Sequence, residues 1–204
     1  MSFDVHHLCP DRSTCLITLQ DVESNPEPAT DPARRAKLPS CRALGYQRSQ
    51  LAPPGTARLP EGWREVTVTS TLGTGVDLFG AVSDDLLELA AHVRAGIRMS
   101  ETDPAYPGDV DFLDGPMRGP CRLVDRTDES LRQGLVVGTL EGNRTVAEHR
   151  CHVDLDPDTG EVTATSRTAW RAGTYFILPG GARRESQAFR RMSERVLRAL
   201  SFNA

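Results

Sequence analysis

The sequence predicts one α+β domain, in which a curved antiparallel sheet of about six to seven strands wraps around a long C-terminal helix. Three observations support it. A strand and a helical stretch come first; then short alternating segments follow one another from residue 110 to 169, separated by Gly- and Pro-rich turns. A helical pattern with an apolar stripe closes the chain over 182–202. A helix of about 20 residues, roughly 30 Å long, crosses a small domain, so only a curved sheet covers its stripe.

Residues 1–40 have a different composition from the rest. Four of its prolines lie between residues 20 and 40, namely Pro26, Pro28, Pro32 and Pro39. Each proline removes a backbone donor and pushes its predecessor into extended geometry. We therefore expect an extended, partly flexible arm over 1–40 and a single domain over 41–204. His6, His7, Cys9 and Cys15 also lie in the arm, but their spacing matches no zinc pattern, so we expect no metal site.

The first half of the domain predicts a loop, a strand and two short helices. Residues 44–60 have the composition of a loop, and 63–70 alternate as a strand does. Apolar residues then recur at helical spacing over 76–93, and we expect this stripe to be buried: Phe79, Val82, Leu86, Leu89, Ala90 and Val93. Ser83-Asp84-Asp85 is expected to cap a second helical piece. Gly73-Thr74-Gly75 fits a tight strand-to-helix turn better than a phosphate loop, because it is not G-x-G-x-x-G.

The second half predicts consecutive strands and the closing helix. The expected strands start near residue 97 and then cover 110–113, 120–126, 133–140, 145–155 and 161–169. The closing helix has an apolar stripe made of Phe189, Met192, Val196, Leu197 and Leu200. This order is that of the helix-grip fold of the START, birch-pollen-allergen-like and polyketide-cyclase-like superfamily. A cystatin-like fold is the alternative, but its helix normally comes first.

Composition excludes several classes of protein. The 204 residues carry a formal net charge of -4, which gives no basic field for nucleic acid. The N-terminus has no signal-peptide pattern, and no run approaches the roughly 18 apolar residues of a membrane span. The five cysteines are widely spaced and include no C-x-x-C. We therefore expect a cytoplasmic protein with reduced thiols and no cofactor, binding neither nucleic acid nor membranes.

Several segments over 44–201 resemble a bacterial, largely actinobacterial, family of unknown function in the same superfamily. They are Leu72-Gly73-Thr74-Gly75-Val76-Asp77-Leu78-Phe79, Pro120-Cys121-Arg122, Gly134 to Leu140, Ala147 to Cys151, Thr165 to Thr168, and Arg184 to Gln187. The resemblance implies the helix-grip fold, but no established activity. Some positions depart from the family pattern: Leu135, Val137 and Cys151 replace aromatic residues, and Gly142-Asn143-Arg144 replaces a His-Pro loop. Smaller side chains would widen a cavity, which suggests a specialised ligand.

Candidate site residues follow from the alternation of 147–155. Ala147, His149, Cys151, Val153 and Leu155 share the more apolar face, which we expect to face the helix. His149 is the candidate general base, against the plainer interpretation of a hydrogen-bonded core histidine. Cys151 is expected to line the cavity as a packing residue, not as a nucleophile. Glu148 faces the other way; it is either a second acid/base group, reached through a bulge and paired with Arg122 or Arg167, or a cross-strand surface pair.

Four arginines are candidate anchors for an anionic ligand: Arg48, Arg98, Arg122 and Arg167. Three functions remain open. The first is a cofactor-free enzyme of bacterial secondary metabolism. It would catalyse the cyclisation or isomerisation of a small polar intermediate, or an elimination from it, with His149 or Glu148 transferring the proton. The second is a non-catalytic carrier of a small molecule. The third is a partner subunit in a homo- or heterodimer, with the proline-rich 20–40 arm wrapping the other chain.

Overall fold

The computed structural model describes residues 43–46, 59–101, 109–171 and 181–201; the 1–40 arm and Arg48 lie outside these ranges. Ten elements follow one another in these ranges: β1 (Arg64–Thr74), α1 (Val76–Leu87), α2 (Ala90–Arg94), β2 (Met99–Glu101), β3 (Asp109–Phe112), β4 (Gly119–Glu129), β5 (Arg132–Thr139), β6 (Val146–Leu155), β7 (Glu161–Arg171) and α3 (Gly181–Ser201). No helix in the described part of the chain is long and apolar enough to cross a membrane.

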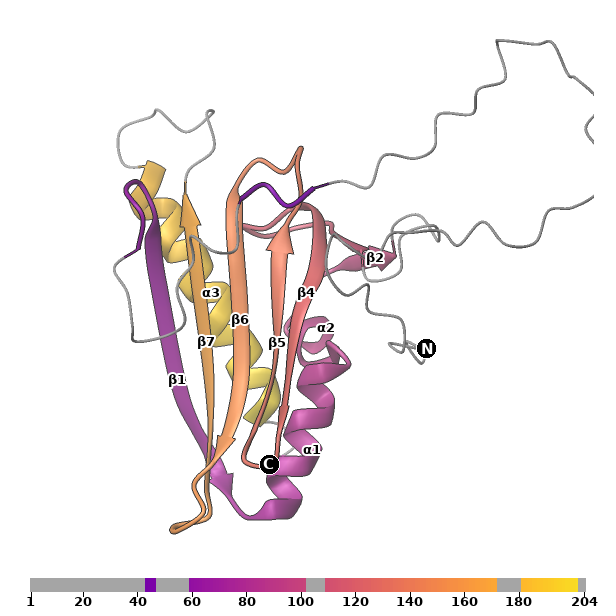
Figure 1. Ribbon diagram of the computed structural model, residues 1–204, viewed down its shortest axis with the longest axis vertical. Coiled ribbons are helices and arrows are strands. Elements are labelled where there is room, and N and C mark those ends of the chain that lie inside the picture. Colours follow the sequence, from indigo (N-terminus) through magenta and orange to yellow (C-terminus); the bar gives the residue numbers. More distant parts are fainter. Residues whose placement is uncertain (1–42, 47–58, 102–108, 172–180, 202–204) are drawn as a thin grey trace, which may run out of the picture.

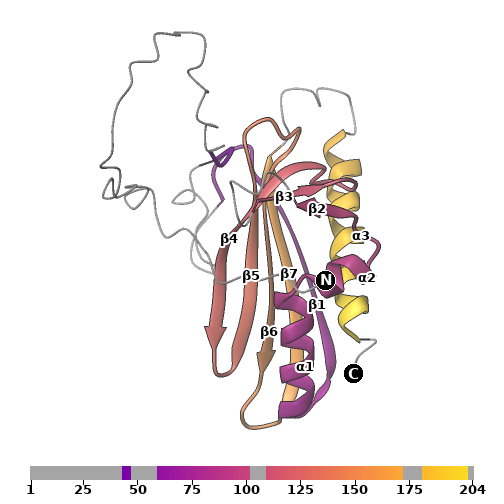
Figure 2. The same cartoon turned by 90° about the vertical axis from the view of Figure 1, so that its right-hand side faces the viewer.

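All seven strands form one antiparallel sheet in the order β1-β7-β6-β5-β4-β3-β2. The sheet curves, and the three helices lie on the same side of it (Figures 1 and 2). The long helix α3 packs against β1 and β7, whereas α1 packs against β5 and β6. This arrangement of a curved antiparallel sheet around a C-terminal helix is the predicted helix-grip fold.

The stripe of α3 builds the core as predicted. Phe189, Met192, Val196, Leu197 and Leu200 are all buried. Phe189 packs on Trp170 of β7, with ring centroids 4.8 Å apart. Two such aromatic side chains bury a large apolar area and gain a further ring–ring attraction of about 1 kcal/mol. This contact joins α3 to the sheet near the start of the helix.

The helical region breaks at a different place from the one predicted. Ser83-Asp84-Asp85 starts no new helix, because α1 runs on to Leu87 and buries Ser83. The break comes at Leu89, whose φ of 58° places a non-glycine residue in the left-handed region. This turn changes the phase of the helical pattern. Consequently Val93, predicted to be buried, is 57% exposed, and His92 points inward instead.

A second, smaller apolar cluster lies on the opposite side of the sheet. The short segment 43–46, within the region predicted to be a loop, runs beside the end of β5, where Leu44 forms an isolated bridge with Leu140. Tyr46 and Trp63 meet edge to face with ring centroids 5.8 Å apart, and Ala169 completes their buried cluster. The helix side of the sheet is called the inner face below, and this side the outer face.

Candidate functional site

Strand β6 places the predicted site residues on two opposite faces. His149 and Cys151 lie on the inner face, as predicted, together with Ala147, Val153 and Leu155, and all five are buried. Glu148 lies on the outer face, directly opposite Gly138 of β5 and Ala169 of β7. The register shift near this site is in β4, between Leu123 and Asp125, and β6 pairs with both neighbours without one. No bulge therefore turns Glu148 inward.

His149 is fully buried and joined to two other polar side chains. Its Nδ1 lies 2.9 Å from Thr168 Oγ1 on β7, the residue directly opposite in the sheet. Its Nε2 lies 3.4 Å from Nε2 of His92, which reaches across from α2. Burial lowers the pKa of His149 to about 4, so the ring is neutral at pH 7. A neutral imidazole can accept a proton, but a pKa of about 4 makes it a weak base at pH 7.

His92 is a site residue that sequence reasoning missed. It is fully buried, and its pKa falls to about 3, first through burial and then through its neighbour His149. Its Nδ1 is buried and has no hydrogen-bond partner among the described residues. The helical periodicity selected Val93 in its place, because nothing in the pattern indicates the left-handed residue at Leu89. Thr168, His149 and His92 are called the inner polar cluster below.

Cys151 is buried on the inner face of β6. Only 1% of its surface is exposed. Burial raises the pKa of its thiol to about 12, so at neutral pH it is protonated and a poor nucleophile.

Glu148 is buried on the outer face beneath Tyr46. Tyr46 Oη donates a hydrogen bond to Oε2 at 2.8 Å, and Arg150 Nε donates to Oε1 at 2.6 Å. Its ion pair with Arg150 joins two residues of the same strand, and not the two strands of the predicted surface pair. Tyr46 can lie here because Gly138 has no Cβ, which would clash with Tyr46 Oη. A glycine inside a strand marks such a close approach and is the sequence signal for this contact.

The three predicted arginines that the structure describes all form ion pairs. Their partners are Asp114 for Arg98, Asp109 for Arg122 and Glu65 for Arg167. Arg98 is on the surface, with 73% of its side chain exposed. Arg122 and Arg167 point to the outer face, because they lie opposite Gly138 and Arg150 in the sheet. The structure therefore brings none of these three together with His149.

Further polar groups lie between the inner face and the helices. Ser166 of β7 donates to Ser193 of α3 at 2.8 Å, and Thr145 donates to Glu185 of α3 at 2.9 Å. Among the described residues, five buried side-chain atoms have no hydrogen-bond partner: Ser83 Oγ, His92 Nδ1, Asp111 Oδ1, Trp170 Nε1 and Glu185 Oε2. Four of them belong to elements that enclose the interior, namely α1, α2, β7 and α3.

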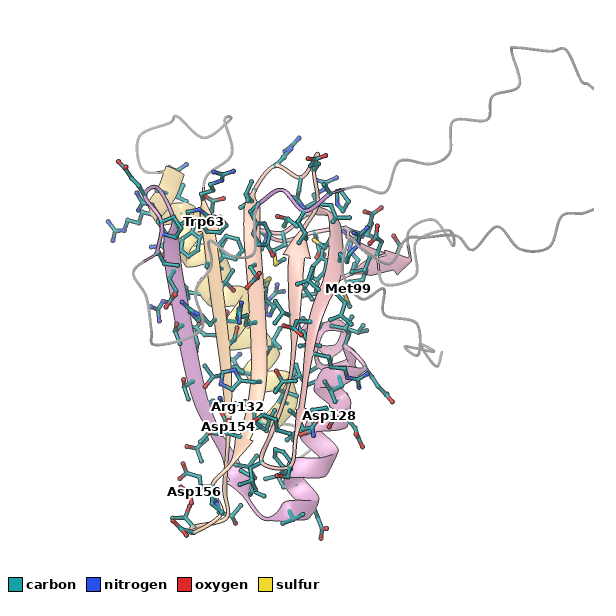
Figure 3. The ribbon with its side chains drawn as sticks, in the orientation of Figure 1. Trp63, Met99, Asp128, Arg132, Asp154 and Asp156 are labelled. Atoms are coloured by element: carbon teal, nitrogen blue, oxygen red, sulfur yellow. The ribbon has the colours of Figure 1, made fainter. Side chains whose placement is uncertain are left out.

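An open pocket of about 440 Å³ lies elsewhere, where the hairpins β4–β5 and β6–β7 end. Arg132 and Asp154 form an ion pair on its wall, with Asp156 below them in Figure 3. The other wall residues are Glu129, Leu131, Leu155, Glu161 and Thr163. None of the predicted site residues that the structure describes lines this pocket. The pocket is therefore separate from the inner polar cluster and from Glu148.

Comparison with known sequences places the chain in a family. A family described as "Domain of unknown function (DUF1990)" matches residues 46–199, well over half of the chain. The protein belongs to the DUF1990 family. This agrees with the predicted resemblance to a family of unknown function; an actinobacterial origin stays a prediction. No curated protein matches the sequence.

The solved structures that resemble this DUF1990 protein include the following three. A protein from Deinococcus radiodurans is 16% identical, with 69% of this chain and 100% of that chain covered and a TM-score of 0.42. Ara h 8.0201 is 15% identical, with 70% and 97% covered and a TM-score of 0.44. A conserved protein from Geobacillus kaustophilus is 12% identical, with 69% and 97% covered and a TM-score of 0.42.

Proposed function

We propose that this DUF1990 protein binds a small, partly polar organic molecule between the inner face of the sheet and α3. One observation carries the proposal: Ser83, His92, Trp170 and Glu185 each hold a buried polar atom with no partner among the described residues. A buried polar atom without a partner costs about 1–3 kcal/mol. Four such atoms around one interior are expensive for a protein that only has to fold, whereas a polar ligand could pair with them.

Several of the described interior side chains are almost fully buried, so a ligand that reaches their polar atoms must displace some of them. His149 and Phe189 expose none of their surface, Trp170 exposes 1% and Met192 2%. Met192 is suited to such a rearrangement, because methionine is unbranched and adapts to irregular spaces. We therefore expect slow association, limited by the opening of the interior.

A second candidate function, cofactor-free acid/base catalysis, is favoured by the inner polar cluster. Thr168, His149 and His92 form a row of hydrogen-bonding groups that ends at the unpaired Nδ1 of His92. If a ligand delivers a proton to one neutral ring, the adjacent ring can share it. Such a row suits the cyclisation, isomerisation or elimination of a small intermediate, which require proton transfer and no redox step.

Native mass spectrometry of the protein purified under non-denaturing conditions tests the binding function. We expect a mass above that of the chain alone. Organic solvent should release the bound molecule that accounts for the difference. A second measurement uses the Trp63→Phe variant, in which Trp170 is the single tryptophan of the sequence. Its emission should change when neutral aromatic alcohols such as 2-phenylethanol bind. A bare chain mass together with unresponsive emission would contradict the proposal.

The part played by His149 has its own test. His149→Ala should abolish or strongly weaken ligand retention and any proton-transfer activity, because it removes the centre of the inner polar cluster. His152→Ala is the matched control, since His152 lies three residues further along the same strand on the outer face. If His149→Ala retains the ligand as the wild type does, the site is not centred on His149.

A further inference from the structure

A buried carboxylate on α3 has only one of its two oxygens paired. Glu185 is 8% exposed, and its Oε1 accepts a hydrogen bond from Thr145 Oγ1 at 2.9 Å. Its Oε2 is buried and has no hydrogen-bond partner in the described part of the chain. Within the same residues, no arginine, lysine or histidine forms an ion pair with Glu185. Among the described residues, Glu185 is thus a buried acid without a counter-charge.

Stability does not explain a carboxylate at this position. Glu185 lies on the buried stripe of α3, one turn before Phe189, where an apolar side chain would pack without cost. A buried carboxylate that is neither paired nor fully hydrogen-bonded is strongly destabilising. The helix dipole offers little compensation, because its effect falls off within the first turn and Glu185 lies beyond that turn of α3. A group outside the described residues is therefore the natural partner for Glu185.

Trp170 brings a second unsatisfied group to the same end of the interior. Its Nε1 is buried and has no acceptor within the described residues. Its ring contacts Phe189, one helical turn after Glu185. In the sheet it lies opposite Ala147, two residues after Thr145, which holds the other oxygen of Glu185. An unpaired donor, an unpaired carboxylate oxygen and two aromatic rings, as far as the described residues show, therefore lie at the same end of the interior, along the first half of α3.

From this juxtaposition we infer that Glu185, Thr145 and Trp170 bind the polar end of an organic amine. This inference rests on the proposed small-molecule function and names the class of its ligand. A protonated amine supplies the positive charge and the donor that Glu185 Oε2 lacks. A hydrogen-bond acceptor beside the amine, such as a hydroxyl or amide oxygen, receives the N–H of Trp170. The apolar part of the ligand lies along the inner face.

The chemistry of the site favours an amine over the anionic ligand predicted from the sequence. A buried carboxylate repels an anion, and the described arginines that were expected to bind one are held by Asp114, Asp109 and Glu65. The charge of Glu185 thus selects for an amine.

Three matched probes test the inference by titration of Trp170 emission in the Trp63→Phe protein: 2-phenylethylamine, 2-phenylethanol and 3-phenylpropanoate. We expect the amine to bind most tightly. Glu185→Gln should weaken binding of the amine by about 10- to 100-fold, the range expected for the loss of a charge-assisted hydrogen bond. The affinity for the alcohol should stay unchanged. Glu194→Gln is the matched control, because Glu194 is an exposed glutamate of the same helix.

Thermal unfolding without probe separates this role from a structural one. Glu185→Gln keeps the shape and the bond to Thr145 while removing the unpaired charge, so its midpoint should rise or stay equal. A large fall in the midpoint, with no selective loss of amine binding, would show that Glu185 is structural and overturn the inference. Equal binding of all three probes would overturn it but leave the binding function standing. Failure of every probe to bind the Trp63→Phe protein would overturn both.

Discussion

His149 and Glu148 are neighbours in the sequence, yet they lie on opposite faces of β6 in two different kinds of buried environment. His149 is covered by α2, has neutral partners and has a lowered pKa. Glu148 is covered by Tyr46, and an ion pair with Arg150 balances its charge. The inner polar cluster therefore depends on keeping its histidines uncharged, whereas the outer face around Glu148 depends on keeping its charges paired. Conditions or substitutions that affect one face should spare the other.

Acidification should destabilise the chain mainly through the inner face, and this is the largest effect we expect. The pKa values of His149 and His92 are lowered from 6.5 to about 4 and about 3. Their contribution to stability is complete above pH 6.5 and is lost as the pH falls toward these values. Between pH 6.5 and 5 two such groups should cost about 3 to 4 kcal/mol in the free energy of unfolding.

Urea unfolding at pH 7 and pH 5 measures this loss. The variants His149→Phe and His92→Phe each remove one of the two histidines, so each should show a smaller difference between the two pH values. If one of them does not fold, the other still decides. If the folded variant loses as much stability between pH 7 and pH 5 as the wild type, the inner polar cluster is not the source of the acid sensitivity.

Removal of Glu148 should destabilise the outer face by a smaller amount. Glu148→Ala leaves the guanidinium of Arg150 and the hydroxyl of Tyr46 without their shared partner. Because the side chain of Arg150 is 23% exposed, water compensates in part, and we expect a loss of about 2–3 kcal/mol in urea unfolding at pH 7. Glu65→Ala breaks the more exposed pair with Arg167 and should cost less than about 1 kcal/mol. Equal losses would mean that burial does not distinguish the two pairs.

Loss of the Tyr46 hydroxyl should have a smaller effect than loss of Glu148. Tyr46→Phe keeps the ring on Trp63 but removes the hydrogen bond to Glu148 Oε2. We expect a loss of about 1–2 kcal/mol, since a bond to a charged acceptor is worth more than a neutral one. Binding of the probes at the inner face should not change, because Tyr46 lies on the outer face. The control compares the Trp63→Phe protein with the Tyr46→Phe/Trp63→Phe double variant. If the probes change Trp170 emission differently in the two proteins, the two faces are coupled.

The pattern of the sequence was sufficient for the architecture and for the faces of β6. Alternation over 147–155 separated His149 from Glu148, and the apolar stripe of α3 predicted its buried side. Both periodicities are local, because neighbouring backbone geometry alone decides which side chains share a face. The order of the elements then limited the fold, since a long amphipathic helix after consecutive antiparallel strands needs a sheet curved around it.

Only the tertiary structure decided which side chains meet. His92 reaches His149 because the left-handed Leu89 shifts the helical phase, and Tyr46 reaches Glu148 because Gly138 leaves room above β5. Glu185 meets Thr145 from 40 positions away in the sequence. Contacts of this kind join residues that no local period relates, so they follow from how the elements pack. The sequence by itself therefore determined the sheet, the helix and their faces, and packing decided the chemistry between them.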